Sequence, residues 1–147
     1  MDRDAIQQKF PSYMAHIKLP ECAVEQSITV YRACKTRRIE RESFLNTYEE
    51  NGFQVSAGES PDNPQEYCLS TFERARDLKR FVSIDGHYKP PFILAKGTTE
   101  PSCGVSCRSK EWKEGARARK SSHVDWWLYE GAEPWIFFTE VDYEEEK

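Results

Sequence analysis

His123 and Asp125 are the residues whose types and spacing best suit proton-transfer chemistry. They stand two positions apart in the aromatic run His-Val-Asp-Trp-Trp-Leu-Tyr, which is typical of a strand. Alternate residues of a strand face the same side, so we expect the two side chains within about 7 Å of each other. A histidine tuned by a carboxylate can transfer protons, and a structural histidine at a strand start is the alternative. The further carboxylates nearby are Glu130, Glu133 and Glu140.

Arg32 is a candidate for binding an anionic group. It follows Tyr31 within residues 28–34, where alternating apolar and polar residues predict a strand. A planar guanidinium on a strand can hold a phosphate or a carboxylate through two parallel hydrogen bonds. The alternative is an arginine on an edge strand whose aliphatic part covers the core.

Ser70 and Thr71 form a hydroxyl pair at the end of a short predicted strand, residues 67–69. Hydroxyls and amides at a junction from strand to helix can bind an anionic ligand. The same residues also open the sequence Ser-Thr-Phe-Glu, which matches a capping box. In that alternative they only begin the helix predicted over residues 71–82.

The cysteines form an odd set without regular spacing. Cys103 and Cys107 could supply two zinc ligands, and His123, His87 or Cys68 could complete a tetrahedron. No second pair has a matching spacing, so we predict no metal site and no disulfide between Cys103 and Cys107. In a reducing compartment we expect free, mostly buried thiols. The five cysteines are Cys22, Cys34, Cys68, Cys103 and Cys107.

Residues 108–120 form a basic segment within an acidic chain. The overall net charge of -4 argues against a general nucleic-acid binder, although a local basic patch remains compatible with it. Gly115 interrupts any helix here, so we expect a loop or a short helix that could contact a macromolecular target. Its cations are Arg108, Lys110, Lys113, Arg117, Arg119 and Lys120.

The elements that must position these residues indicate a single α+β domain, residues 1–147, with peripheral helices. The length of 147 residues suits one core. Helical spacing predicts a broken helical segment over 1–26 and a helix over 43–51 that ends at Asn51-Gly52. Two-residue periodicity predicts an antiparallel or mixed sheet, with which a split is compatible. Its strands are expected at 28–34, 92–96, 123–129 and 135–141.

The last two of these strands are predicted to form a C-terminal aromatic hairpin at the centre of the sheet. A short turn, Glu-Gly-Ala-Glu, separates them, and three of the four tryptophans lie here. Both faces of the second run carry aromatic residues, which is typical of an inner strand covered on both sides. The expected core residues are Trp126, Leu128, Ile136 and Phe138.

The chain carries no signal of membrane insertion. No apolar run approaches the roughly 20 residues that a membrane span needs, and the N-terminus is too polar for a signal peptide. We therefore predict a cytoplasmic protein that does not contact membranes. Residues 144–147 are expected to be a solvated acidic tail.

Three of these features, in the same order, resemble ADP-ribosyltransferase-like domains. An aromatic residue and an arginine stand on an early strand, a Ser-Thr pair follows a later one, and Glu140 is the nearest match to a late glutamate. The resemblance implies that Arg32 holds NAD, that Ser70 and Thr71 support the nicotinamide pocket, and that Glu140 orients the acceptor. This chain has Phe72 where a second serine is usual, and no Glu-x-Glu or Gln-x-Glu element precedes Glu140.

Two function classes follow. The first is a small transferase that binds NAD or a related nucleotide and transfers ADP-ribose, with Glu140 and His123 as candidate catalytic residues. The second is a non-catalytic accessory or inhibitory module that binds a macromolecule through the basic segment and exposed aromatic residues. Convergence of Arg32, Ser70 and a late glutamate on one cleft favours the enzyme. A convex patch of arginine and tryptophan favours the module.

Overall fold

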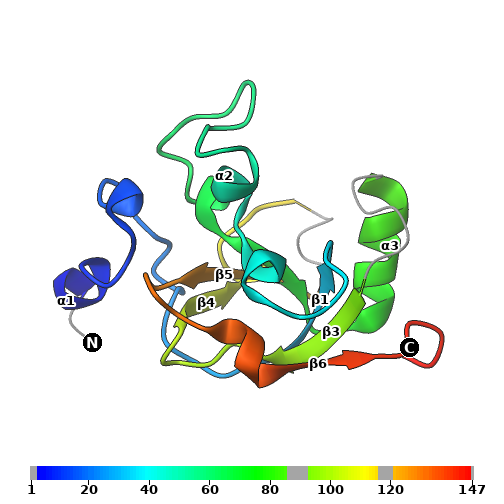
Figure 1. The fold of residues 1–147 in the computed structure, drawn as a ribbon. Coiled ribbons are helices and arrows are strands. Elements are labelled where there is room, and N and C mark those ends of the chain that lie inside the picture. Colours follow the sequence, from blue (N-terminus) through cyan, green and yellow to red (C-terminus); the bar gives the residue numbers. More distant parts are fainter. Residues whose placement is uncertain (1–2, 86–92, 116–120, 147) are drawn as a thin grey trace.

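A six-stranded antiparallel sheet forms the centre of the molecule in our computed structural model, which describes residues 3–85, 93–115 and 121–146 (Figure 1). The order of strands across the sheet is β4-β5-β2-β1-β3-β6. This confirms the α+β class and the presence of strands near all four predicted positions. The strands are β1 (Thr29–Cys34), β2 (Leu69–Phe72), β3 (Ile93–Thr98), β4 (Gly104–Arg108), β5 (His123–Leu128) and β6 (Phe138–Val141).

Helices are short and lie around the sheet. The α-helices are α1 (Arg3–Gln7), α2 (Thr47–Glu50) and α3 (Ala75–Asp85). The 3-10 turns are η1 (Ser12–Met14), η2 (Arg41–Phe44), η3 (Pro64–Tyr67), η4 (Ser109–Glu111) and η5 (Pro134–Phe137). The helical segment expected over 1–26 is limited to α1 and η1. The helix expected over 43–51 is divided into η2 and α2, because Leu45 and Asn46 have extended backbones, and α2 ends at Asn51 and Gly52 as predicted. No helix of the described residues is long and apolar enough to cross a membrane.

One face of the sheet is covered by two separate parts of the chain. At one end, α3 packs Leu78 and Val82 against Tyr31, Phe72 and other apolar residues. At the other end, residues of the N-terminal segment form a second apolar cluster with residues of β4, β5 and Tyr129 on the same face. That cluster contains Ile6, Phe10, Met14, Ile17, Val105, Cys107, Trp127 and Tyr129. Strand alternation places Asp125 and His123 on this face, between the two clusters.

The opposite face is covered by irregular chain rather than by long helices. Phe44 of η2 contacts Trp126 and Phe138 through aromatic edges, with ring centroids 6.4 and 5.0 Å apart. Trp135 of η5 packs against the same cluster, which also contains Val30, Leu69, Ala95 and Val124. Trp126 and Phe138 are therefore core residues, as predicted, and Leu128 is half-buried.

The predicted C-terminal hairpin is wrong. β5 pairs with β2 and β4, whereas β6 pairs with β3 at the far edge of the sheet. The first half of the second aromatic run is η5, so it cannot pair as a strand. Ile136 is 63% exposed there, which contradicts the expected core position. After β5, Gly131 adopts a positive φ of 77° and Pro134 begins η5, so a turn and a 3-10 helix follow β5 in place of a returning strand.

Two other predictions near the site also need correction. Ser70 and Thr71 lie within β2 and cap no helix, since α3 begins only at Ala75. Thr71 is β-branched and buried, and its hydroxyl donates to the carbonyl of Val124 at 2.9 Å. Strand β4 was not among the predicted strands, because its residues, Gly-Val-Ser-Cys-Arg, are too small and polar to show a clear alternation.

The sheet is nearly split between β1 and β2. These strands share one residue pair, Tyr31 with Phe72, whereas β1 pairs with β3 along its whole length. Toward the ends at Cys34 and Leu69 the two strands diverge. A split sheet leaves backbone groups that need other partners and space that other side chains must fill.

Candidate functional site

Arg32 fills the gap between β1 and β2. Its side chain donates to three backbone carbonyls: from Nε to Ser43 at 2.8 Å, from Nη1 to Ser70 at 2.9 Å, and from Nη2 to Leu45 at 3.3 Å. The residue is only 4% exposed, and its guanidinium lies over the ring of Phe44. Arg32 thus joins the split strands and fixes residues 43–45, and its guanidinium is committed to the backbone.

The structure does not bring the three sequence-derived candidates together in one cleft. Glu140 is exposed on the edge strand β6 and lies in line with Ala95 and Arg32, two strands away. Strand alternation puts the Ser70 side chain on the opposite face of the sheet from Arg32. The convergence that would favour catalysis by this set is therefore not present.

His123 and Asp125 are in contact, as their spacing predicted. The Nδ1 atom of His123 lies 3.3 Å from Oδ1 of Asp125 and 2.5 Å from the hydroxyl of Ser109. Because the single Ser109 proton goes to Oδ2 of Asp125 at 2.7 Å, Nδ1 of the imidazole must be the protonated nitrogen. Nδ1 of His123 therefore donates to the Ser109 hydroxyl, and that hydroxyl donates to the Asp125 carboxylate.

Asp125 is the centre of a buried polar network and is itself 0% exposed. Besides Ser109, it accepts hydrogen bonds from Gln65 and Trp112 at 3.0 and 2.9 Å, and from Lys113 at 3.3 Å. The Cys68 thiol donates to Oδ1 at 3.4 Å. A carboxylate that accepts so many hydrogen bonds fixes the segment 109–113 onto the sheet.

Electrostatics explain the protonation states in this network. Burial lowers the pKa of His123 to about 4, against the opposing effect of Asp125, so the imidazole is neutral at pH 7. Burial alone would raise the pKa of Asp125, but His123, Lys113 and the hydrogen-bond donors outweigh it and hold the pKa below its usual value. Burial and the Asp125 charge raise the pKa of Cys68 well above that of a free thiol. Cys68 is therefore a poor nucleophile.

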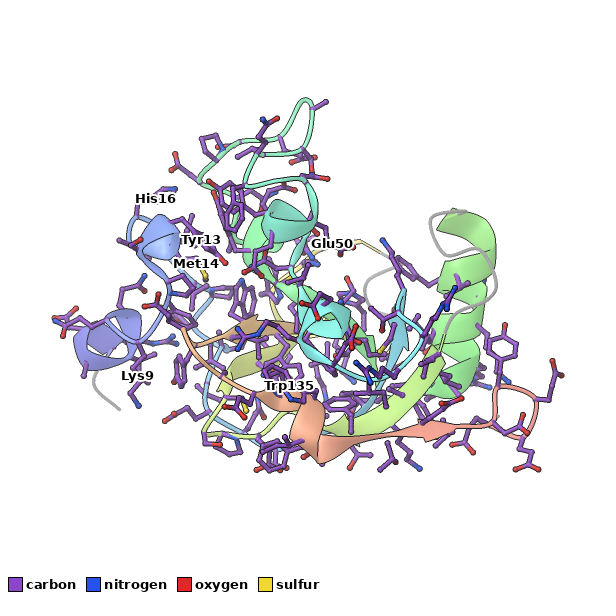
Figure 2. The ribbon with its side chains drawn as sticks, in the orientation of Figure 1. Lys9, Tyr13, Met14, His16, Glu50 and Trp135 are labelled. Atoms are coloured by element: carbon purple, nitrogen blue, oxygen red, sulfur yellow. A yellow bond between two sulfur atoms is a disulfide. The ribbon has the colours of Figure 1, made fainter. Side chains whose placement is uncertain are left out.

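A pocket with a volume of about 400 Å³ opens at the divided end of the sheet. Tyr13 of η1 and Tyr67 of η3 line it, and their rings stack with centroids 6.0 Å apart. In Figure 2, Tyr13 extends from η1 toward the segment that carries α2. The other aromatic residues of the lining are Phe44, Phe53, Tyr129 and Trp135.

Polar groups at this pocket come from the segment that Arg32 fixes and from the loop after β5. Asn46 caps α2 and also donates from Nδ2 to the Tyr13 hydroxyl at 3.1 Å. Burial raises the pKa of this phenol, which keeps its proton. Arg41 lies over the ring of Trp135 at 5.2 Å, and Glu49 and Glu130 are the carboxylates of the lining.

Phe53 at the pocket rim has a left-handed backbone, with φ of 62°. Its amide donates to the carbonyl of Tyr48 at 2.9 Å, directly after Gly52, and this closes the end of α2. The side chain is 59% exposed and stands edge-on to Tyr13 and Tyr48. A left-handed backbone is uncommon for a bulky residue and costs about 1–3 kcal/mol. The sequence signal for this pocket was the density of tyrosine and phenylalanine in irregular segments.

The basic segment is partly neutralised. Arg108 forms a two-pronged ion pair with Glu73, at 3.0 Å for both hydrogen bonds, and Lys113 pairs with Asp125. Lys110 is exposed, whereas Arg117, Arg119 and Lys120 lie outside the described residues. Binding of a macromolecule through this segment stays a prediction.

The prediction that all five cysteines are free thiols is wrong for Cys22 and Cys107. Cys107 forms a disulfide with Cys22, while Cys34, Cys68 and Cys103 are free and buried. The carboxylate of Glu111 lies within 4.8 Å of both sulfur atoms. Within the described part of the chain this is the one cluster with metal-ligand chemistry, and the disulfide occupies both of its sulfur atoms.

The fold and pocket define an α+β domain with an aromatic cavity at a split sheet. No protein-family model matches the chain, and neither curated proteins nor solved structures include a significant match. Functional inference therefore depends on the geometry of the site.

Proposed function

We propose that this chain is a nucleotide-binding domain whose ligand, with NAD as the first candidate, occupies the aromatic pocket. The observation that carries the proposal is the combination of aromatic walls with an arginine at the mouth of a cavity of about 400 Å³. Small-molecule sites of proteins span about 300–1,000 Å³, so this volume suits the ring-bearing half of a dinucleotide.

The walls offer stacking surfaces for a flat heterocycle. Tyr13 stacks on Tyr67, which is buried, and the exposed ring of Phe53 stands edge-on to Tyr13 at the rim. Aromatic side chains stack on bases through their ring faces, at about 1–3 kcal/mol per base. Asn46 and the Tyr13 hydroxyl add polar groups that can orient a ring amide or an exocyclic amine.

Arg41 is the phosphate-binding residue in this proposal. It is exposed at the mouth of the pocket and stacks on Trp135, which holds the guanidinium in place while leaving its edges accessible. A stacked guanidinium can donate two parallel hydrogen bonds to a phosphate. Arg41 thus takes the role that the resemblance gave to Arg32, which serves to fix the adjacent pocket wall.

The resemblance to ADP-ribosyltransferase-like domains extends the proposal to transfer of ADP-ribose. In that reaction the bond between ribose and nicotinamide breaks, and positive charge develops on the ribose. A carboxylate near the ribose stabilises this charge. Glu49 is engaged in the capping box of α2, so Glu130 is the lining carboxylate that we assign to this role.

Calorimetric titration with NAD, ADP-ribose and nicotinamide tests the proposal. We expect wild type to bind NAD, and Arg41→Ala to bind NAD and ADP-ribose about tenfold or more weakly, because a charged hydrogen bond contributes about 1.5–3 kcal/mol. Nicotinamide lacks phosphate, so its affinity should not change. Arg38→Ala is the matched control, since Arg38 pairs with Glu40 and does not line the pocket.

Failure of wild type to bind any of the three ligands would overturn the proposal. Equal affinity of wild type and Arg41→Ala for NAD would remove the assigned role of the arginine. Transfer is tested separately by release of nicotinamide from NAD. Glu130→Gln should abolish that release while retaining NAD binding.

A further inference from the structure

The disulfide between Cys22 and Cys107 is the covalent connection between the N-terminal segment and β4. Cys107 is buried in β4, and Cys22 lies 85 residues earlier, in the segment that follows η1. Cys22 is half-buried, and it is the less buried of the two bonded residues. The other cysteines are buried and unpaired.

The N-terminal segment has little regular structure of its own. Its helix α1 has five residues and η1 has three, and isolated helices of this length are unstable in water. Its position depends on packing against Trp127 and Tyr129, on a backbone bridge from Val24 to Ser106, and on the disulfide. The amide of Glu130 also donates to the carbonyl of Lys9 at 2.9 Å.

The same segment forms one wall of the pocket. Pro11, Ser12 and Tyr13 line the cavity, and the Tyr13 ring packs against Tyr67 of the lining and against Tyr48. Met14 is buried directly after them, and Figure 2 shows Tyr13 and Met14 on the same turn. Displacement of η1 would therefore remove Tyr13 from the cavity and open it on one side.

We propose that the Cys22–Cys107 disulfide is a redox latch that holds the η1 wall of the pocket, so that its reduction opens the pocket and weakens ligand binding. The effect on ligand binding rests on the proposed function, whereas the displacement of η1 after reduction does not. A dithiol supplies the two electrons and two protons. One of its thiolates attacks the Cys22 sulfur to form a mixed disulfide, and Cys107 leaves as a thiolate that takes up a proton. The second thiolate of the dithiol then attacks the dithiol sulfur of the mixed disulfide, which releases Cys22 as a thiol and leaves the dithiol as a cyclic disulfide.

Glu111 sets how readily the latch opens. Its carboxylate lies within 4.8 Å of both sulfur atoms and is 3.8 Å from Nη1 of Arg108. Negative charge beside a cysteine disfavours the thiolate that must leave during reduction. We therefore expect Glu111→Gln to be reduced faster than wild type by the same dithiol.

Hydrogen exchange of the oxidised and the dithiothreitol-reduced chain tests the latch directly. The amides of Met14, Ala15 and Ile17 form hydrogen bonds within the η1 region, and reduction should speed their exchange by about tenfold or more. Amides of the β1–β3 ladder should not change. Cys22→Ser should match reduced wild type without reductant, and Cys103→Ser, at a free cysteine, is the control.

Titration with NAD is the second arm, and reduction should lower the affinity by about tenfold. Unchanged exchange in residues 12–17 after reduction would overturn the latch, and so would loss of protection throughout the β1–β3 ladder. Faster exchange that is confined to residues 12–17 supports the latch, whether or not the chain binds NAD. Absence of NAD binding in both forms would count against the proposed function only. NAD binding of equal strength in both forms would overturn the coupling to the pocket.

Discussion

The guanidinium of Arg32 donates from Nη1 to the carbonyl of Ser70 at 2.9 Å across the gap where β1 and β2 separate. A side chain here satisfies a backbone acceptor that the neighbouring strand does not. The remaining donors of Arg32 hold residues 43 and 45, which flank the pocket residue Phe44. One buried arginine thus stabilises the split and positions a wall of the cavity.

Replacement of Arg32 by alanine should lower the free energy of unfolding by about 3 kcal/mol or more, because three backbone carbonyls, one buried and two partly buried, lose their donor. Chemical denaturation measures this loss. Arg38→Ala is the control, since that side chain is 84% exposed and its loss should cost about 0.5 kcal/mol or less. A cost below about 1 kcal/mol for Arg32→Ala would contradict the structural role.

Replacement of Trp126 by alanine should lower the free energy of unfolding by about 3–5 kcal/mol. The indole is fully buried and packs against Phe44 and Phe138, so its removal leaves a cavity. Ile136→Ala in η5 should change stability little, because Ile136 is exposed. Denaturant melts of the two variants compare them directly. Similar losses for both would show that η5 is packed differently.

The free energy of unfolding should fall as the pH drops from about 6.5 to about 4, because His123 becomes protonated more readily in the unfolded chain than in the folded one. The folded pKa of about 4 lies below the ordinary value, so the unfolded chain binds a proton that the folded chain does not. The shift corresponds to a loss of about 3 kcal/mol across that window. Below it, titration of Asp125 should remove further stability, because its folded pKa is also lowered.

Unfolding free energies measured between pH 7 and pH 4 check this dependence. His123→Gln should flatten the slope, because the group with the lowered pKa is removed. An identical slope in wild type and His123→Gln would show that His123 is not the group responsible.

Replacement of Phe53 by glycine should separate ligand binding from stability. Glycine adopts the left-handed φ of 62° without strain, and the side chain is mostly exposed, so the melting temperature should stay within a few degrees of wild type. NAD affinity should fall by about fivefold or more as a stacking surface is lost. Thermal unfolding and calorimetry measure the two effects. Unaltered NAD affinity would place the ligand away from this rim.

The sequence alone determined those features that depend on local preferences. Period-two alternation located strands near 28–34 and 123–129, and Asn51-Gly52 ended α2, because left-handed backbone after a helix favours glycine. The contact between His123 and Asp125 also followed from spacing, since alternate residues of one strand face the same side. These results need no knowledge of distant parts of the chain.

Tertiary structure decided the strand partners, the place of Arg32 and the pocket. Neighbouring aromatic runs favoured a hairpin, yet β5 pairs with β2 and β4 whereas β6 pairs with β3 at the opposite edge of the sheet. The 3-10 turn η5 occupies the first half of the second run, so these residues cannot form a strand beside β5. Ser70 and Thr71 suited both a cap and a strand, and pairing with β5 selected the strand. The partners of Arg32, the Cys22–Cys107 disulfide and the Tyr13 wall join residues far apart in sequence, so only the folded chain brings them together.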